Sequence, residues 1–165
     1  MINNNIIRKA IDKDIPAIQQ VATTSWNHTY EGIISAEVQE DFLKMAYSEK
    51  ALIHRLESTL FFIAEVNGKV VGFSSFSNID TSKKTAVLAA IYLYPEFQKR
   101  GIGSKLLQHG LVQLNGVERL LVEVEKDNIT GKAFYTSKGF KIEKEYVEEF
   151  SGHQLPTILM SLSLN

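Results

Sequence analysis

Cysteine is absent from this chain of 165 residues. Its absence excludes a disulfide scaffold, a metal site with thiolate ligands and a cysteine nucleophile. A formal net charge of −1 argues against a protein that binds nucleic acid through a large positive electrostatic field. No apolar run approaches the roughly 18 residues of a membrane span, and the polar start of the chain lacks the apolar core of a signal peptide. We therefore expect a cytoplasmic protein.

Histidine is scarce and scattered along the chain. No spacing typical of metal ligands occurs among the four histidines, so we expect no metal site; they are His28, His54, His109 and His153. Hydrophobic residues make up 44% of the chain and charged residues 22%, which is ordinary for a globular protein. A chain of this length buries a real core, and we expect one domain over residues 1–165.

The first third of the chain predicts one strand followed by helices. Residues 6–10 have the composition of a short strand, after which an aspartate can cap a helix that ends near Trp26. The polar and aromatic stretch 25–32 is typical of a loop. Further helices are expected from Ser35 onward and over about residues 49–57.

The pattern then changes to strands. Asn67-Gly68 separates two β-rich runs at 60–66 and 69–76, and this pair is a strong signal for a hairpin. The remaining expected elements are strands at 86–94, 120–125, 140–150 and 155–164, with helices after Gly101 and Asn128. The order β-ααα-βββ-α-β-α-ββ predicts a mixed α/β domain.

The stretch from Ala86 to Leu107 carries the clearest functional signal. Its apolar run through Tyr94 suits a strand buried on both faces, which should stop at Pro95 because proline cannot donate to a sheet ladder. The turn that follows, Gln98 to Ser104, contains glycines and leads into a helix with apolar residues at helical spacing. Free N–H groups and the dipole at a helix N-terminus favour an anion, and phosphate is the natural candidate.

The turn does not match the better-known phosphate loops. A dinucleotide fingerprint needs a glycine where Leu106 stands, and a P-loop needs a Gly-Lys-Ser/Thr sequence that the chain lacks. The turn resembles the Q/R-x-x-G-x-G/A signature of the GCN5-related N-acetyltransferases, here Gln98-Lys99-Arg100-Gly101-Ile102-Gly103. A second block, from Asn128 to Phe140, is similar to the N-x-x-x-x-x-F-Y-x-x-x-G-F pattern of the same family.

The resemblance covers roughly residues 6 to 163 and implies a fold, a donor and a reaction. The implied fold is a single α/β (α+β) domain with a mixed, mostly antiparallel sheet of six to seven strands, splayed at the central strand and flanked by helices. The implied activity is direct transfer of an acetyl group from acetyl-CoA to an amine. The absence of cysteine fits a mechanism with no acyl-enzyme.

The resemblance also implies the cofactor-binding residues. Pantetheine would pair with the central strand, the pyrophosphate would sit on the glycine turn, and Asn128 would hydrogen-bond the pantetheine arm. Tyr135 matches the family tyrosine that protonates the leaving sulfur, and the N–H near Leu93 is a candidate oxyanion donor. The implied set is Ile91, Tyr92, Leu93, Gln98, Lys99, Arg100, Gly101, Ile102, Gly103, Ser104, Asn128, Phe134 and Tyr135.

One part of the family's catalytic machinery is missing. Many members place a Glu on the central strand that deprotonates the amine, but residues 86–91 contain no acid. An alkyl amine has a pKa near ~10.4, so a group must take its proton. The candidates are His28 or Glu31 in the aromatic stretch, Glu123 or Glu125 on the next strand, or a chain of waters.

The acceptor site is expected around residues 25–32. A loop in this place borders the acceptor pocket in the family, so the candidate substrate-binding residues are Trp26, His28, Tyr30 and Glu31. The alternative is that these aromatic residues only cover an edge of the core. The region looks most like the small bacterial spermidine/spermine acetyltransferases, which makes a polyamine or another small amine the first hypothesis.

Several alternatives stay open at this level. The acceptor is otherwise a protein N-terminus or a lysine, or the chain is a non-catalytic acetyl-CoA-binding module that regulates a partner. The acidic cluster on the closing strands is either solvated surface or an attraction for a cationic acceptor; it consists of Glu143, Glu145, Glu148 and Glu149. A homodimer is also open, whereas no nucleic acid or membrane is expected as a partner.

Overall fold

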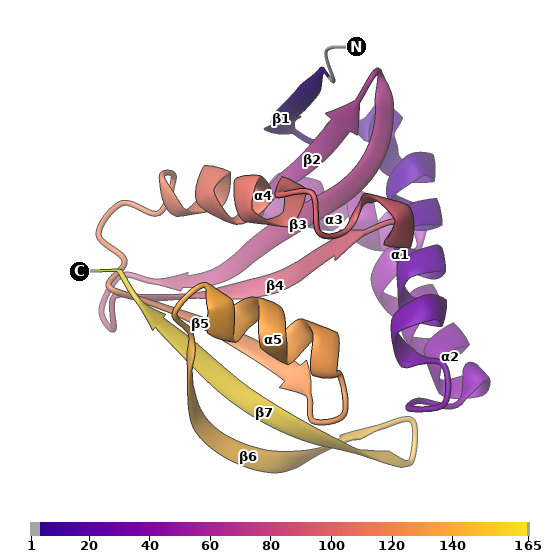
Figure 1. Ribbon diagram of the computed structural model, residues 1–165, viewed down its shortest axis with the longest axis vertical. Helices are drawn as coiled ribbons and strands as arrows, with labels where there is room; N and C mark the ends of the chain where they lie inside the picture. The colour runs from indigo at the N-terminus through magenta and orange to yellow at the C-terminus, as the bar shows by residue number, and fades with distance from the viewer. Residues whose placement is uncertain (1–3, 165) are drawn as a thin grey trace.

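The computed structural model describes residues 4–164, which form one sheet with helices on both faces (Figure 1). The strands are β1 (Asn5–Lys9), β2 (Leu60–Val66), β3 (Lys69–Asp80), β4 (Thr85–Leu93), β5 (Arg119–Glu125), β6 (Lys141–Phe150) and β7 (His153–Ser163). The helices are α1 (Ile15–Tyr30), α2 (Ala36–Tyr47), α3 (Glu49–Ser58), α4 (Ile102–Leu111) and α5 (Ile129–Ser137), with 3₁₀ turns η1 (Asp12–Asp14) and η2 (Pro95–Phe97). The predicted order of elements is confirmed. The first residues, on which the signal-peptide prediction depends, lie partly outside the described range.

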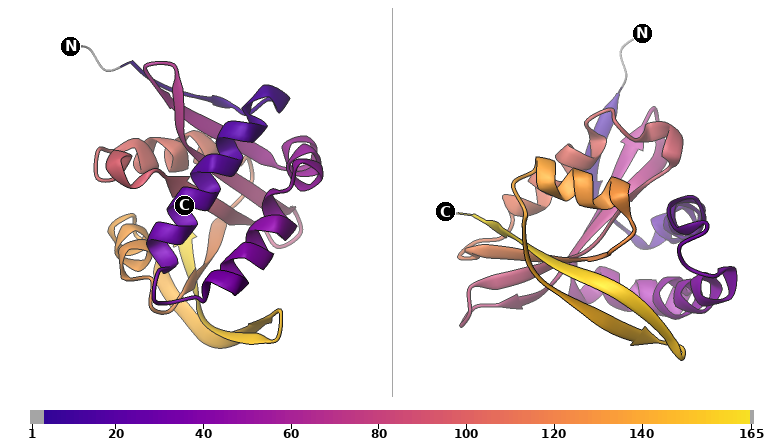
Figure 2. Two further views of the ribbon diagram at one scale, coloured as in Figure 1. Left: turned by 90° about the vertical axis from the view of Figure 1, so that its right-hand side faces the viewer. Right: turned by 60° about the horizontal axis from the view of Figure 1, so that its bottom comes forward.

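The sheet is mixed and mostly antiparallel, as expected. Its strand order over the described residues is β1-β2-β3-β4-β5-β7-β6, and only the β4–β5 pair is parallel. Helices α1, α2 and α3 cover one face, while α4 and α5 cover the other (Figures 1 and 2). The apolar faces predicted for the helices therefore have a sheet surface on which to be buried.

Large apolar side chains of β2, β3 and α4 lie at the centre of the core. Phe61, Phe73 and Phe76 are fully buried, as is Leu106 of α4. A Cβ added at Gly110 would lie only 2.0 Å from the Phe76 ring, so the helix approaches β3 closely because this position has no side chain. The close packing fixes α4, and with it the glycine turn at its start.

The sheet opens between β4 and β5, which confirms the expected splay. The two strands pair only from Thr85 with Arg119 to Val87 with Leu121. On the other side of β4, Ala89 is an extra residue between the partners of Ser75 and Phe76, and this bulge bends the strand. Beyond it β4 continues to Leu93 and β5 to Glu125 without pairing to each other.

Helix α1 is longer than the sequence predicted. The loop predicted at 25–32 is wrong, because the helix continues to Tyr30. Trp26 and Tyr30 lie one turn apart, and both are buried in a cluster with Ile34 and Val38. Tertiary burial of these rings stabilises the last turn, while the polar residues between them form its exposed face.

The central strand agrees with the prediction except in its burial. Burial on both faces was wrong, since Ala89 is exposed where β5 diverges from β4. The strand ends at Leu93 and Pro95 starts η2, as predicted.

The Asn67-Gly68 hairpin is confirmed, with φ of +52° and +82° at its two residues. The last hairpin is tighter than predicted, because β7 already begins at His153.

An ion-pair network fixes the start of α1. Asp14 occupies the N-cap position, yet its carboxylate makes no cap bond to the helix. It accepts hydrogen bonds from the Arg8 guanidinium at 2.8 and 2.9 Å and from the Ile11 N–H at 2.8 Å. Glu65 of β2 accepts from the same guanidinium at 2.7 Å. The network therefore joins β1, β2 and α1.

Neither a metal cluster nor a membrane-spanning helix is found among the described residues. Within residues 4–164, no group of three His, Asp or Glu side chains is placed to hold a metal ion. No helix in that range is both long and apolar enough to cross a bilayer.

Candidate active site

The gap between β4 and β5 is the first part of the site. A strand presents N–H and C=O groups alternately to its two sides, so the edge of β4 from Leu88 to Leu93 faces the gap with no strand partner. Ile91 and Tyr92 are half-buried at this edge, and Leu93 is buried. An extended molecule with amide groups fits such an edge as an added strand does.

The glycine turn lies beyond the end of β4, at the N-terminus of α4. Gly101 holds the N-cap position at φ +82°, a left-handed conformation that glycine adopts without strain. Within the described chain, the backbone N–H groups from Gly101 to Ser104 donate to no backbone or side-chain acceptor. Lys99 and Arg100 are exposed beside them. Free N–H groups, the helix dipole and two cations together form a site for an anion.

The second motif packs directly on the first. A Cβ added at Gly103 would lie 3.1 Å from the Phe134 ring of α5 and 3.7 Å from the Leu93 side chain. Glycine at this position therefore allows α5 to approach the turn. Asn128 caps α5, because its Oδ1 accepts the Gly131 N–H at 2.9 Å. Its side chain also interacts with the Tyr30 phenol, which places the Asn128 amide at the gap.

Two tyrosines lie at the gap, one from each side. Tyr135 of α5 is partly buried, with the Phe134 and Phe140 rings edge-on at 5.6 and 5.4 Å. Burial raises the pKa of Tyr135, and the nearby Tyr30 raises it further. Burial also raises the pKa of Tyr92 on β4 well above its ordinary value. Both phenols therefore keep their protons at neutral pH.

An aromatic cluster covers the α1 side of the gap. Trp26 stacks on Phe42 of α2 with ring centroids 4.2 Å apart, and Tyr30 and Tyr92 lie 4.6 and 6.4 Å from the indole. Phe150, at the end of β6, meets Phe42 edge-on at 5.7 Å. The buried indole N–H of Trp26 has no hydrogen-bond partner within the described chain. The cluster joins α1, α2, β4 and the β6–β7 hairpin.

Tyr30 connects this cluster to the second motif. Burial raises the pKa of Tyr30, whereas hydrogen-bonding interactions with Tyr92 and Asn128 lower it and the charge of Glu125 raises it. The phenol therefore interacts with both β4 and the turn before α5. The structure thus brings Trp26 and Tyr30 together with Tyr92, Asn128 and Tyr135, although the sequence separates them widely.

Carboxylates extend from the gap along β5 and β6. Glu125 is 9% exposed, and its Oε2 accepts the Asp127 N–H at 2.6 Å. Burial raises its pKa, and this effect outweighs the lowering by the Asp127 N–H. Glu123 lies on the same face of β5 two residues earlier and accepts the Tyr146 hydroxyl. Burial raises the pKa of Glu148, and Glu123 raises it further.

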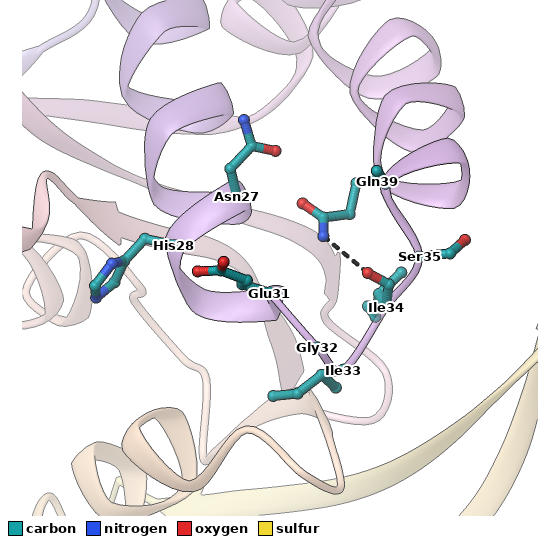
Figure 3. Close-up of a pocket in the computed structure, with 9 residues that line it drawn as sticks. Asn27, His28, Glu31, Gly32, Ile33, Ile34, Ser35 and Gln39 are labelled. Atoms are coloured by element: carbon teal, nitrogen blue, oxygen red, sulfur yellow. Dashed lines mark hydrogen bonds between the residues drawn. The ribbon is translucent and has the colours of Figure 1, made fainter.

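His28 and Glu31 lie elsewhere. His28 is exposed on α1, and Glu31 is the exposed residue that follows the last turn of this helix; both line a pocket of about 750 Å³ between the end of α1 and the start of α2 (Figure 3). Trp26 and Tyr30 are on the buried face of the same helix. The four acceptor residues predicted from sequence are thus divided between two sides of α1, and only two of them reach the gap.

Some residues of the site had no sequence signal of their own. Phe42 looked like an ordinary core position of α2, and Phe150 like the end of a closing strand. The period-2 spacing of Tyr146, Glu148 and Phe150 predicts a shared face of β6. Only the curvature of the β6–β7 hairpin brings that face to the aromatic cluster (Figure 2).

Comparisons with known proteins bear on this arrangement. A model of the acetyltransferase (GNAT) family matches residues 15–140. A spermidine N(1)-acetyltransferase of Thermoplasma acidophilum is 30% identical over 145 residues, 83% of this chain and 88% of that protein. The peptidyl-lysine N-acetyltransferase YiaC of Escherichia coli is 29% identical over 94% of this chain and 95% of its own. The crystal structure of the PaiA N-acetyltransferase of Thermoplasma acidophilum, in complex with coenzyme A, superposes with a TM-score of 0.83 and 28% identity, covering 97% of this chain and 99% of that one.

Proposed function

The chain belongs to the GNAT family of acetyltransferases, and from that premise we propose that it acetylates a primary amine of a small cationic molecule such as a polyamine. It is an acetyl-CoA-dependent N-acetyltransferase, since the family model matches most of the chain and a relative of the same fold is solved with coenzyme A. The observation that carries the choice of acceptor is the contact between Phe42 and Phe150.

The donor fits the gap and the turn. We assign the pantetheine arm to the open edge of β4 at Ile91 to Leu93, with the Asn128 Nδ2 as a donor to its amide oxygens. The pyrophosphate is assigned to the free N–H groups at the start of α4. Lys99 and Arg100 supply positive charge there, and Gln98 and Phe134 border the turn.

Tyr135 is the group that we assign to protonate the sulfur. The nitrogen of the neutral amine bonds to the thioester carbon, the carbon–sulfur bond breaks, and the phenol proton moves to the sulfur. The nitrogen, positively charged after the attack, loses one proton to water, and the phenolate regains a proton from water. Its raised pKa keeps the phenol protonated until it is needed. A backbone N–H near Leu93 on the open edge donates to the carbonyl oxygen as negative charge develops there.

Glu125 is the base that the geometry favours. Burial raises its pKa toward neutrality, where a carboxylate accepts a proton more readily. The Asp127 N–H holds one carboxylate oxygen, which leaves Oε1 to take the proton of the ammonium ion, directly or through water. His28 and Glu31 are not assigned this role, because they lie on the exposed face of α1.

The acceptor side supports a small cation over a peptide. A peptide needs a groove open at both ends, and one path would run between the α1–α2 helices and the β6–β7 hairpin. Phe42 and Phe150 meet across that path at 5.7 Å, and Leu155 packs on the same cluster. Aromatic rings attract a cation, and Glu123 and Glu148 add negative charge nearby.

An acceptor panel tests the proposal. Release of free CoA is measured with spermidine, 1,4-diaminobutane, a lysine peptide and a peptide with N-terminal alanine. We expect kcat/KM for the polyamines to exceed that for either peptide by about a hundredfold, equal to ~2.7 kcal/mol. Faster turnover of a peptide would contradict the choice of acceptor.

Removing the contact between Phe42 and Phe150, which blocks the path for a peptide, gives a second test. Phe150→Ala should raise the ratio of peptide to polyamine turnover about tenfold, because it removes the ring that meets Phe42. Val147→Ala on the same strand is the matched control, since Val147 is 60% exposed. An equal effect of the two variants would show that the ring does not decide acceptor size.

The donor assignment has its own test. Gly103→Trp should abolish acetyl-CoA binding in calorimetry, because even a Cβ there lies 3.1 Å from Phe134 and an indole would fill the turn. Gln108→Trp, on the exposed face of α4, is the control and should bind as the wild type does. Both variants should unfold cooperatively. Retained binding in the Gly103 variant would remove the turn from the cofactor site.

A further inference from the structure

Phe97 places an aromatic ring directly before the glycine turn. It is the last residue of η2, and its N–H donates to the Tyr94 carbonyl at 2.9 Å. The next N–H, that of Gln98, donates to the Pro95 carbonyl at 3.2 Å. The Phe97 side chain is half-buried and packs against the main core. The ring therefore has a fixed position at the edge of the anion site that we assign to the turn.

The Arg100 guanidinium lies over this ring. Its central carbon is 5.2 Å from the ring centroid of Phe97. The chain turns on either side of Arg100 through residues in the left-handed conformation, Lys99 at φ +62° and Gly101 at φ +82°. Glycine adopts this conformation freely, whereas a lysine is strained by it. The surroundings must therefore hold the turn in its shape, and the contact between Arg100 and Phe97 is part of them.

Arg100 differs in its partners from the other arginines of the chain. Arg8 and Arg119 form ion pairs with carboxylates, and Arg55 donates to the Ala46 carbonyl at 2.9 Å. The Arg100 side chain is exposed and makes no ion pair or hydrogen bond with the rest of residues 4–164. The ring attracts its positive charge but leaves its N–H groups free to donate, because they lie in the plane of the guanidinium.

We propose that Phe97 is a positioning residue for the donor: its ring holds the Arg100 guanidinium beside the free N–H groups at the start of α4, where the guanidinium donates to the pyrophosphate. The proposal rests on the assignment of the pyrophosphate to this turn. An exposed arginine adopts many side-chain conformations and loses this freedom when it binds a phosphate. A ring that already restricts the side chain lowers that cost, and two N–H groups can then bond to the phosphate oxygens together.

A double-mutant cycle, with calorimetry of CoA binding, tests the proposal. Phe97→Leu keeps an apolar side chain against the core but removes the aromatic face. It should weaken CoA binding about threefold, or ~0.7 kcal/mol, as expected for a cation–π contact at an exposed site. In the Arg100→Gln background the same substitution should change Kd by less than about 1.5-fold. Phe97→Tyr keeps the ring and should bind as the wild type does. Equal weakening by Phe97→Leu in both backgrounds would overturn the proposal, because the ring would then act only through packing.

Truncated ligands identify the phosphate that is involved. 3′-Dephospho-CoA keeps the pyrophosphate, whereas pantetheine has no phosphate and is titrated by NMR because it binds weakly. Phe97→Leu should weaken 3′-dephospho-CoA as much as CoA and leave pantetheine unchanged. Arg100→Gln, at an exposed position where folding is not at risk, should show the same dependence on the ligand. A loss with CoA alone would place the guanidinium at the 3′-phosphate, and a loss with pantetheine would mean that the whole turn is disturbed. Either result overturns the proposal.

The outcome can be separated from that of the donor assignment. If Gly103→Trp abolishes CoA binding but the cycle shows no coupling between Phe97 and Arg100, the turn remains the cofactor site and only the role of Phe97 fails. If Gly103→Trp binds CoA as the wild type does, the assignment of the turn fails as well. No amine is present in these titrations, so neither result depends on the identity of the acceptor.

Discussion

Replacing Tyr135 with phenylalanine removes a single oxygen from the proposed active site. The phenol donates to no acceptor in residues 4–164, and its ring is held by Phe134 and Phe140. Phenylalanine keeps those ring contacts, so the free energy of unfolding should change by less than about 1 kcal/mol. The substitution thus isolates the chemistry of the hydroxyl from the packing of α5.

The expected loss of rate follows from the role of a general acid. Such groups contribute roughly 10²–10⁴-fold. We expect the lower end, because a thiolate with a conjugate-acid pKa near ~8.5 leaves more readily than an alkoxide or an amide anion. In Tyr135→Phe, kcat should therefore fall about a hundredfold, or ~2.7 kcal/mol of transition-state stabilisation. The Kd for acetyl-CoA should stay within about twofold, because the hydroxyl acts mainly when negative charge develops on the sulfur and the neutral thioester sulfur is a weak acceptor.

The assay is release of free CoA with saturating spermidine, paired with calorimetry of acetyl-CoA binding. Tyr92→Phe is the matched variant, because Tyr92 is a second buried phenol at the gap with a raised pKa. We expect it to lose less than about tenfold in kcat. A large loss in Tyr92→Phe with none in Tyr135→Phe would refute the assignment of the acid. Full activity in both variants would refute phenol catalysis altogether.

Three further outcomes are expected. Wild-type activity should rise as pH increases through the raised pKa of the Glu125 carboxyl, and Glu125→Gln should lower kcat/KM and abolish this rise; a pH profile that is the same in both proteins would exclude Glu125 as the base. Asp14→Asn should cost about 1.5–3 kcal/mol of unfolding free energy at pH 7. Burial acts to raise the pKa of Asp14, but the bonds from Arg8 and from the Ile11 N–H together outweigh burial and lower the pKa. This contribution is therefore present above the unfolded pKa of ~3.9 and is lost as pH falls through the folded value. The free energies of unfolding of wild type and variant, measured by chemical denaturation, should therefore converge at low pH. A difference that stays constant with pH would contradict this coupling between folding and proton binding. Gly110→Ala should destabilise by about 1–3 kcal/mol despite the better helix propensity of alanine, because the new Cβ would lie 2.0 Å from the buried Phe76 ring; a higher Tm would show that the ring moves freely.

The sequence determined the elements that depend on local chemistry. The Asn67-Gly68 hairpin, the stop at Pro95 and the helix capped by Asn128 follow from backbone preferences that act within a few residues. The glycine turn was predictable for the same reason, since Gly101 needs positive φ at the start of α4. These local signals were sufficient to indicate the family, the donor and the order of strands and helices.

The tertiary structure decided what depends on faces and distances. The sequence showed Trp26, His28, Tyr30 and Glu31 as one polar and aromatic stretch, which suggested a loop. Burial of two of these residues against α2 and β4 extended the helix and turned the other two to the opposite side. Helical geometry then assigned one pair to the gap and the other to the outer pocket, a division that sequence proximity hides.

The acceptor side was likewise set by long-range packing. The contact of Phe42 with Phe150 joins residues more than a hundred positions apart, and it depends on how the β6–β7 hairpin curves. The sequence alone therefore determined the donor and the family. The shape of the acceptor site arises where distant segments meet, because its geometry is a property of the packed chain rather than of any local pattern.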